Sequence, residues 1–281
     1  MIKFRFYFYI LSIILVLWGG IAPNILKINF GIDIVGGQVI ELKSKDIEKL
    51  KNKIESLKIS KQVIKQKDSL IIKSKNINPY KVVNDLRSEF KDIELIRYEE
   101  VSPSLSRELT KKSIWAVISV LILIGSYISI VFYNKKKIIS SLLLGLVVIL
   151  TLFHDVIATF GIYVLLSNIF SFELTTVTII ALILIAGFSV HDTIVVFDRL
   201  REKINQFGNL SIEIFDLSIK ETIARSINTS LTTILAVIPL LFTIKILTPF
   251  ILIIITGIII GTYSSICLAV PLVYDLTRKN K

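Results

Sequence analysis

The sequence predicts a membrane bundle of six transmembrane helices, with one folded domain outside the membrane inserted after the first helix. Two observations carry this prediction. Hydrophobic residues make up 53% of the 281 residues and the mean hydropathy is +0.72, which is too high for an ordinary soluble domain. These residues are gathered in six long runs that one polar stretch interrupts. The expected divisions are therefore residues 1–23, 24–112 and 113–281.

The first apolar run, Phe6–Ala22, follows the basic residues Lys3 and Arg5. Such a run is either a cleaved signal peptide or a retained helix. It is long for the hydrophobic core of a signal peptide, and Pro23 follows where a cleaved bond would have to lie. We therefore expect an uncleaved first transmembrane helix.

Five further apolar runs each approach or exceed the roughly 20 residues that cross a hydrocarbon core. They lie at about 114–133, 138–166, 174–198, 226–244 and 249–274. The run at 138–166 is longer than one crossing needs, so we expect it to tilt or to break near Gly161.

Basic residues in the short loops predict the orientation of the bundle. With six spans, four basic segments fall on one side: the N-terminus, the loop with Lys135–Lys137, the segment 199–225 and the C-terminal tail. The short loops of the opposite side offer only Lys245. Both termini are therefore expected in the cytoplasm, with residues 24–112 outside.

The polar stretch 24–112 has a regular order of predicted elements. Alternation predicts four strands, at Gln38–Lys43, Lys61–Gln66, Leu70–Ser74 and Ile93–Val101. Helical spacing predicts a helix at Asp46–Leu57, with Ser44 as its cap, and a second helix from Pro79 through Phe90. A tight turn is expected at Asp68-Ser69. The order β-α-β-β-α-β is the ferredoxin-like α+β pattern, and without histidine, cysteine or a phosphate loop we expect this domain to bind or brace.

The net charge of +11 would suggest a nucleic-acid partner if it lay on a soluble domain. Lysine and arginine fall mostly in the polar domain and in the loops that flank apolar runs, so topology and solvated helix faces explain them. No nucleic acid is expected. The single cysteine, Cys267, lies in an apolar run and excludes an intrachain disulfide.

Inserting an ionisable residue in the middle of a span costs roughly 2.5–3.5 kcal/mol of free energy, so each such residue indicates a function or a specific partner. Asp192 gives the sharpest signal, because it lies about 9 Å inward from Asp198 near the end of the fourth span. Arg225 opens the fifth span at a similar side of the membrane and is the cation expected beside it. A carboxylate whose proton depends on an arginine contact is typical of a proton relay. An ion pair that only pins two helices is the alternative.

His154 and Asp155, inside the third span, are less specific candidates. Adjacent residues on a helix point about 100° apart, so both cannot face one partner. A helix-packing hydrogen bond is the alternative for His154, and packing is what we expect for His191. Metal binding by the two histidines needs more ligands than the spans offer. Three polar residues near span ends complete the supporting candidates: Asp198, Asn228 and Thr229.

Just outside the first span, the sequence Gly31-Ile-Asp-Ile-Val-Gly-Gly-Gln combines three glycines with one carboxylate. Gly31, Gly36 and Gly37 permit turns or close backbone approach, and Asp33 is a candidate to cap or orient such a turn. By spacing alone this motif is a weak signal.

Four motifs together resemble the SecF family of protein-export subunits. Phe30-Gly-Ile-Asp-Ile-Val-Gly-Gly resembles the signature that opens the family's external domain, and Ser189-Val-His-Asp-Thr-Ile-Val-Val-Phe-Asp-Arg-Leu-Arg-Glu resembles its fourth-span motif. His154-Asp155 and Thr222-Ile-Ala-Arg-Ser-Ile-Asn-Thr-Ser-Leu-Thr-Thr are similar to its third- and fifth-span motifs. The resemblance covers nearly the whole chain in the same order. Ile34 departs from it, because an aromatic residue often follows the aspartate in the family.

The resemblance implies a fold and a function beyond these residues. It implies half of a resistance-nodulation-division (RND) transporter that pairs with SecD and associates with the SecYEG channel and other accessory membrane subunits. Such a subunit uses the proton gradient, with no other cofactor, to help move a translocating polypeptide out of the bacterial cytoplasmic (inner) membrane. The family's functional carboxylate falls on Asp192 and its functional arginine on Arg225.

Two other functions stay open from the sequence. A small-molecule or lipid exporter of the same superfamily would need a second six-span repeat or an obligate partner, and larger external domains. A purely structural subunit would stabilise its partners without conducting protons. A conventional enzyme is not expected, because no nucleophile–base pair or metal set is present.

Overall fold

The computed structural model describes residues 1–56, 62–65, 69–74, 78–87, 89–90, 92–133, 139–243 and 247–279. The chain divides into two compact units. The helical unit comprises Met1–Asn29, Ser113–Glu173 and Val177–Lys281. The sheet unit comprises Phe30–Lys112 and Leu174–Thr176. Three residues that the sequence assigns to the fourth span thus group with the sheet unit.

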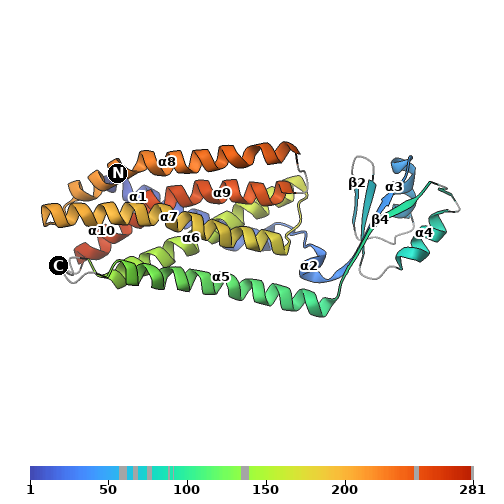
Figure 1. The fold of residues 1–281 in the computed structure, drawn as a ribbon, viewed down its shortest axis with the longest axis horizontal. Coiled ribbons are helices and arrows are strands. Elements are labelled where there is room, and N and C mark those ends of the chain that lie inside the picture. The colour runs from blue at the N-terminus through green and yellow to red at the C-terminus, as the bar shows by residue number, and fades with distance from the viewer. Residues whose placement is uncertain are drawn as a thin grey trace. The chain divides into compact units, whose positions relative to one another are not determined.

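Within the described residues, six helices are long and apolar enough to cross a membrane, which confirms the predicted helical bundle (Figure 1). The first five are α1 (Arg5–Ile25), α5 (Pro103–Val131), α6 (Ser141–Phe170), α7 (Thr176–Phe207) and α8 (Ile212–Thr243). The sixth span joins α9 (Thr248–Ser264), a π-helical turn (Ser265–Ala269) and α10 (Val270–Lys279). A short 3-10 turn (Ile2–Phe4) precedes α1.

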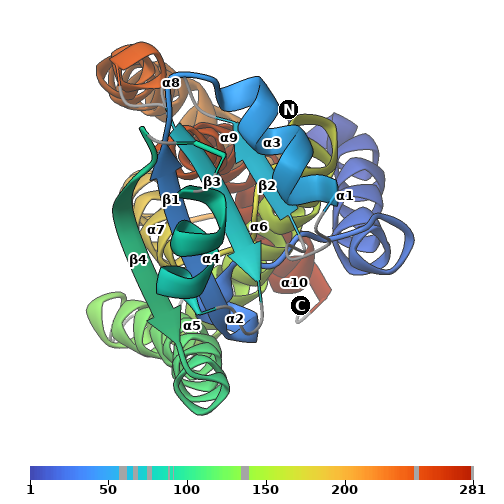
Figure 2. The same ribbon diagram turned by 90° about the vertical axis from the view of Figure 1, so that its right-hand side faces the viewer.

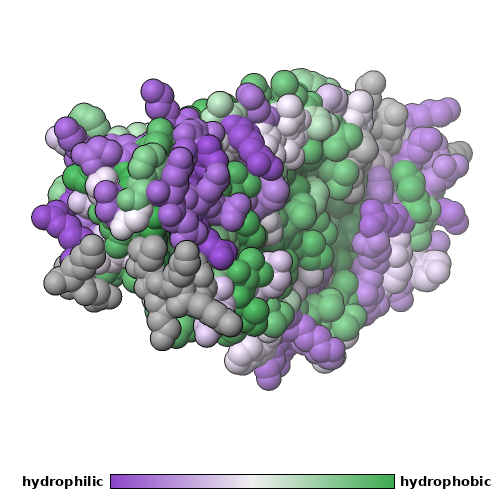
Figure 3. Space-filling model, turned by 60° about the vertical axis from the view of Figure 1, so that its left-hand side comes forward, coloured by the Kyte–Doolittle hydropathy of each residue, from purple (hydrophilic) through white to green (hydrophobic). Residues whose placement is uncertain are grey.

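Helices α7 and α8 both continue beyond the apolar runs that predicted them, by a polar extension at one end. Ion pairs hold these extensions together: Glu221 of α8 pairs with Arg199 and, at 2.8 Å, with Lys203 of α7. Figure 3 shows hydrophobic side chains along the helices and hydrophilic ones gathered at one end of the helical unit. Helix length here follows from charge pairing as well as from hydropathy.

Helix α6 and the sixth span form the interior of the helical unit. Of their most apolar stretches, 56% and 61% are buried, against 11% for α8. The predicted break near Gly161 is wrong, because α6 runs through this residue without interruption. Gly161 serves packing instead: a Cβ at this position would lie 2.5 Å from the Cα of Gly19, so α1 approaches α6 backbone to backbone.

The sheet unit contains four antiparallel strands in the spatial order β2-β3-β1-β4. The elements follow one another as α2 (Ile32–Val35), β1 (Gly37–Lys43), α3 (Ile47–Ser56), β2 (Gln62–Lys65), β3 (Ser69–Ser74), α4 (Pro79–Arg87) and β4 (Glu94–Val101). Figure 2 shows α3 and α4 on the same face of the sheet. The four strands and the helices α3 and α4 each begin within one residue of the predicted start. The short helix α2 was not predicted, because only a turn was expected there.

The core of the sheet unit lies between this face and the two helices. Register places Ile40 opposite Ile72 and Leu42 opposite Leu70, so both pairs point to one face. Leu50 and Leu86 supply the helix side of the same cluster. Helix α4 ends at Arg87 and is therefore shorter than the predicted helix, which ran through Phe90. Phe90 still packs against this cluster from beyond the end of α4.

Two predicted turn features have different outcomes. The hydroxyl of Ser44 accepts a hydrogen bond from the Asp46 backbone N–H at 3.4 Å, just before α3. The Lys45 N–H donates to Asp92 at 2.6 Å and lowers the pKa of that carboxyl. At the predicted turn Asp68-Ser69, Asp68 lies outside the described residues and Ser69 is the first residue of β3.

Candidate functional site

Asp155 is completely buried on α6 and has a full set of polar partners. Its Oδ2 accepts hydrogen bonds from the hydroxyl of Ser189 on α7 and, at 2.7 Å, from that of Ser264 on α9. Its Oδ1 lies 2.8 Å from Nδ1 of His154. This one carboxylate therefore ties three helices together.

The contact between His154 and Asp155 is one that the sequence argument left out. Their Cα–Cβ bonds diverge, but the imidazole is long enough to turn toward its neighbour. The other ring nitrogen of His154, Nε2, is buried and has no hydrogen-bond partner among the described residues. The ring lies 6.3 Å, centroid to centroid, from that of Tyr263.

Asp192 is nearly as buried on α7, with 2% of its surface exposed, but its partners are sparse. Its Oδ2 accepts a hydrogen bond from the Thr262 hydroxyl of α9 at 3.4 Å, well beyond the usual length of an O–H···O bond. Ser226 of α8 is near enough to interact with the carboxylate. Its own hydroxyl oxygen has no hydrogen-bond partner within the described residues.

Arg225 lies within electrostatic range of Asp192 but forms no ion pair with it. Within the described part of the chain, no carboxylate oxygen lies within 4 Å of its guanidinium nitrogens. The physical reason is the helical repeat: Ser226 points inward from α8, so its neighbour Arg225 emerges on the exposed face. Asp192 and Arg225 therefore interact electrostatically at a distance and do not form the ion pair that the sequence predicts.

Serine and threonine hydroxyls that the sequence reasoning did not single out complete the interior. Thr262 is hydrogen-bonded to Ser230 of α8. The hydroxyls of Thr193 on α7 and Ser265 lie 2.8 Å apart, and Ser265 also donates to the Ser189 carbonyl at 3.2 Å. The π-helical turn begins at Ser265, and such turns are frequent at functional sites. The run Gly-Thr-Tyr-Ser-Ser in an otherwise aliphatic helix was the available signal.

Two glycines of α9 set the distance between α9 and α7. A Cβ at Gly261 would lie 2.8 Å from the Cβ of Ser189, and one at Gly257 would lie 2.3 Å from the Cδ1 of Ile185. These glycines, four residues apart, let the two backbones approach closely. This close approach of α9 to α7 allows Ser189 and Ser264 to donate hydrogen bonds to the same carboxylate, that of Asp155.

The remaining span candidates lie apart from this interior. Asp198 is exposed on α7, and Asn228 is exposed on α8. The Thr229 hydroxyl donates to the Arg225 carbonyl at 3.0 Å, within its own helix. None of the three contacts Asp155 or Asp192 through a hydrogen bond among the described residues.

The glycine motif, residues 31–37, forms hydrogen bonds with Leu174 and Thr176 at the start of α7. The carboxylate of Asp33 accepts a hydrogen bond from the backbone N–H of Thr176, the first residue of α7. The N–H of Gly31 donates to the Leu174 carbonyl at 2.8 Å. Asp33 therefore caps the helix that carries Asp192, where we expected it to cap a local turn.

Gly36 and Gly37 have φ angles of 75° and 146°, which favour glycine. A Cβ at Gly36 would lie 2.9 Å from the Cα of Pro103, at the start of α5. These two positions therefore need glycine both for their backbone conformation and for the space beside them.

Comparisons with known proteins show what this chain is similar to. A family model described as "Protein export membrane protein SecD/SecF, C-terminal" matches residues 81–279. Protein translocase subunit SecF of Sebaldella termitidis is 32% identical over 100% of this chain and 92% of its own length. The SecF subunit of Calditerrivibrio nitroreducens is 36% identical over 98% of this chain and 92% of its own length.

A solved structure extends the likeness to the fold. The crystal structure of SecDF from Thermus, described as a translocon-associated membrane protein, has a TM-score of 0.81 at 28% identity. The alignment covers 100% of this chain and 38% of that one, so the chain spans well under half the length of the solved protein. On the family model, the relatives and this fold, the chain belongs to the SecD/SecF family of protein export membrane proteins.

Proposed function

We propose that this chain acts as the SecF-type accessory subunit of the Sec translocase. In this proposal it pairs with a SecD subunit, associates with the SecYEG channel and uses the proton-motive force to promote late-stage export of polypeptides. The observation that carries the proposal is the state of Asp192, a buried carboxylate that accepts a long hydrogen bond from Thr262 and interacts with Ser226. His191 and Arg225 lie within electrostatic range of it, and neither forms an ion pair with it among the described residues. Such a carboxylate can change partners when it gains or loses a proton.

The coupling step follows from this geometry. Protonation removes the charge of Asp192 and with it the attraction to Arg225, so α7 and α8 gain freedom to shift against one another. Asp33 holds Thr176, the first residue of α7, and Gly31 holds Leu174 just before it. A shift of α7 therefore pulls on the sheet unit through continuous backbone. The sheet unit then grips or releases the exported chain.

The energy available is sufficient for such a step. A membrane potential of 100 mV supplies about 2.3 kcal/mol per charge moved. Since 1.4 kcal/mol changes an equilibrium tenfold, one proton shifts a two-state element by more than tenfold. That biases movement in one direction without unfolding a substrate domain by itself.

The proposal includes a topology for each part of the chain. Both termini lie in the cytoplasm of a bacterial cell, and residues 24–112 form an extracytoplasmic domain. We assign that domain to the ferredoxin-like class, on the element order and the strand order β2-β3-β1-β4. The proton gradient is the only energy source invoked, and no cofactor is required.

The test is export of a secreted precursor into inverted membrane vesicles that contain SecD and this chain at matched levels. Asp192→Asn should assemble normally and lose the stimulation that the proton-motive force gives. Asp198→Asn is the matched control, because it removes an exposed carboxylate from the same helix. Stimulation of the Asp192→Asn vesicles equal to that of wild type would show that this carboxylate is structural.

A further inference from the structure

Ser226 of α8 is buried beside Asp192 and has a hydroxyl that is not engaged elsewhere. Only 1% of its surface is exposed, and its Oγ has no hydrogen-bond partner among the described residues. The Asp192 carboxylate lies within its interaction range. Because a buried hydroxyl without a partner has lost its bonds to water and gained none in return, its presence indicates a function.

Two other buried hydroxyls of α8 bond to their own helix instead. Ser218 donates to the Ile214 carbonyl at 2.8 Å, and Thr222 donates to the Ser218 carbonyl at 2.8 Å, in each case four residues earlier. Serine and threonine inside helices often bond in this way. The same spacing offers Ser226 the Thr222 carbonyl, but this bond is absent among the described residues. The Ser226 hydroxyl is therefore free to serve another helix.

Asp192 has no hydroxyl donor committed to it. Thr262 carries a single hydroxyl proton, and its bond to the Ile258 carbonyl, at 2.9 Å, is shorter than its bond to Asp192, at 3.4 Å. Ser230 is bonded to the same Thr262 hydroxyl. When the Thr262 proton bonds to its own helix, Ser226 is the remaining hydroxyl donor for the carboxylate within the described part of the chain.

The charged and titratable groups around Asp192 do not fill this place. His191 on α7 and Arg225 on α8 lie within electrostatic range of the carboxylate, but neither forms an ion pair with it among the residues described. On α6, His154 and Asp155 bond to one another. The group that α9 directs at the carboxylate is a hydroxyl. The ionised form of Asp192 therefore depends on hydroxyl donors.

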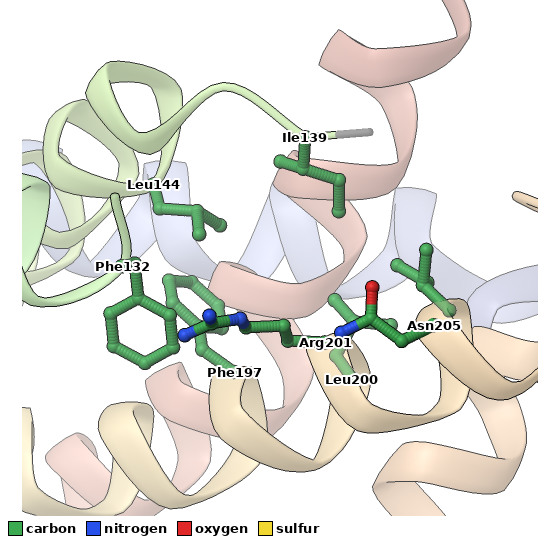
Figure 4. A pocket seen from close by; sticks show the side chains of 8 residues that line it. Phe132, Ile139, Leu144, Phe197, Leu200, Arg201 and Asn205 are labelled. Atoms are coloured by element: carbon green, nitrogen blue, oxygen red, sulfur yellow. The ribbon is translucent and has the colours of Figure 1, made fainter. Parts of the chain in front are cut away.

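The next unpaired cation along α7 is too distant to contribute. Arg201 is nine residues beyond Asp192, which is about 13 Å along the helix axis. Figure 4 shows its side chain in a separate small pocket that Phe132 and Phe197 also line. Its guanidinium therefore takes no part in the surroundings of Asp192.

We propose that Ser226 is a positioning residue that stabilises the ionised form of Asp192. Its hydroxyl donates to the carboxylate when Asp192 is charged, and this bond links α8 to α7. When Asp192 takes up a proton, the neutral carboxyl attracts this donor less, and the Ser226 hydroxyl turns back to the Thr222 carbonyl. The inference rests on the proposed proton coupling and names the contact through which that coupling acts.

Such a contact separates two states of the helices better than the charge of Arg225 does. Attraction between separated charges weakens gradually with distance, whereas a hydrogen bond weakens steeply once its atoms move apart or tilt. Ser230 lies one turn beyond Ser226 on α8 and stays bonded to Thr262 of α9. Proton uptake therefore releases α8 from α7 while α8 remains attached to α9.

The test is infrared difference spectroscopy of the full chain in complex with SecD, titrated from high to low pH. The C=O band of protonated Asp192 should reach half its intensity about one pH unit higher in Ser226→Ala, because the ionised carboxylate has lost its donor. Ser226→Thr keeps a hydroxyl and should return the midpoint toward that of wild type. Ser218→Ala is the matched control, since it removes a fully buried hydroxyl that bonds to its own helix.

The Asp192→Asn variant identifies the band and separates this inference from the proposed function. A band that persists in Asp192→Asn would overturn both. A band that disappears in Asp192→Asn but keeps the wild-type midpoint in Ser226→Ala would overturn this inference alone. Equal shifts in Ser226→Ala and Ser218→Ala would also overturn it, because the effect would then not depend on contact with Asp192.

Discussion

Two carboxylates inside the helical unit are buried to almost the same extent but have different surroundings. Asp155 accepts hydrogen bonds from Ser189 and Ser264 and is hydrogen-bonded to His154. Asp192 has the long bond from Thr262 and an interaction with Ser226, and His191 and Arg225 lie within electrostatic range without pairing with it. Burial alone therefore does not identify a coupling group. A carboxylate with all its partners holds helices in place, whereas one with few partners is able to exchange them.

The largest expected effect is the loss of stability when Asp155, the carboxylate with more hydrogen-bond partners, is replaced. Asp155→Ala removes three polar contacts, leaves Ser189 and His154 without this partner in the interior, and leaves Ser264 with only the Gly261 carbonyl among the described residues. Each hydrogen bond to a charged group contributes about 1.5–3 kcal/mol, so we expect severe loss of folded protein. The lone thiol, Cys267, is partly buried in the last span, and its reaction with a fluorogenic dye on heating reports unfolding.

Asp192→Asn, measured in the same way, should unfold close to the wild-type temperature. Equal destabilisation by the two substitutions would remove the distinction between the two carboxylates.

A smaller effect is expected where helices pack backbone to backbone. Gly161→Ala would place a Cβ 2.5 Å from the Cα of Gly19, which forces α1 away from α6. Overpacking of this kind costs about 1–3 kcal/mol. Gly187→Ala is the matched control on α7, because no described atom lies within 4 Å of its added Cβ outside the local helix. The thiol assay should show a lower unfolding temperature for Gly161→Ala alone, and equal behaviour of the two variants would contradict the packing.

The smallest effect concerns the start of α7. Asp33→Ala removes the cap on the Thr176 N–H, and loss of such a cap costs about 0.5–2 kcal/mol. Hydrogen exchange followed by mass spectrometry should be faster in peptides that contain residues 174–180. Asp46→Ala, in the same unit but distant from this contact in the sequence, serves as the control. Unchanged exchange in Asp33→Ala would mean that the motif does not hold the helix that carries Asp192.

Local patterns predict the elements of this fold because they depend on local chemistry. Apolar run length gives the six spans, and alternation or helical spacing gives the elements around the core of Ile40, Leu50 and Leu70. The polar extensions of α7 and α8 were not predicted, because their ion pairs join residues about 20 positions apart.

The candidate site could be predicted only in its ionisable members. Asp155 and Asp192 stand out because charge is rare inside spans. Serine and threonine are common there, so the run that contains Thr262 and Ser264 marks a polar patch on α9 but does not show which carboxylate of another helix each residue meets. The side of α8 on which Arg225 emerges depends on helix rotation, which a single apolar run does not fix.

Infrared difference spectroscopy of the chain in complex with SecD tests most directly whether Asp192 is the carboxyl that exchanges a proton. Acidification of the wild-type complex should produce the C=O stretching band of a protonated carboxyl in an apolar environment. Asp192→Asn should abolish this band, and Asp198→Asn should preserve it. A band of full intensity in Asp192→Asn would contradict the account and assign the proton to another buried carboxyl, with Asp155 the first to examine.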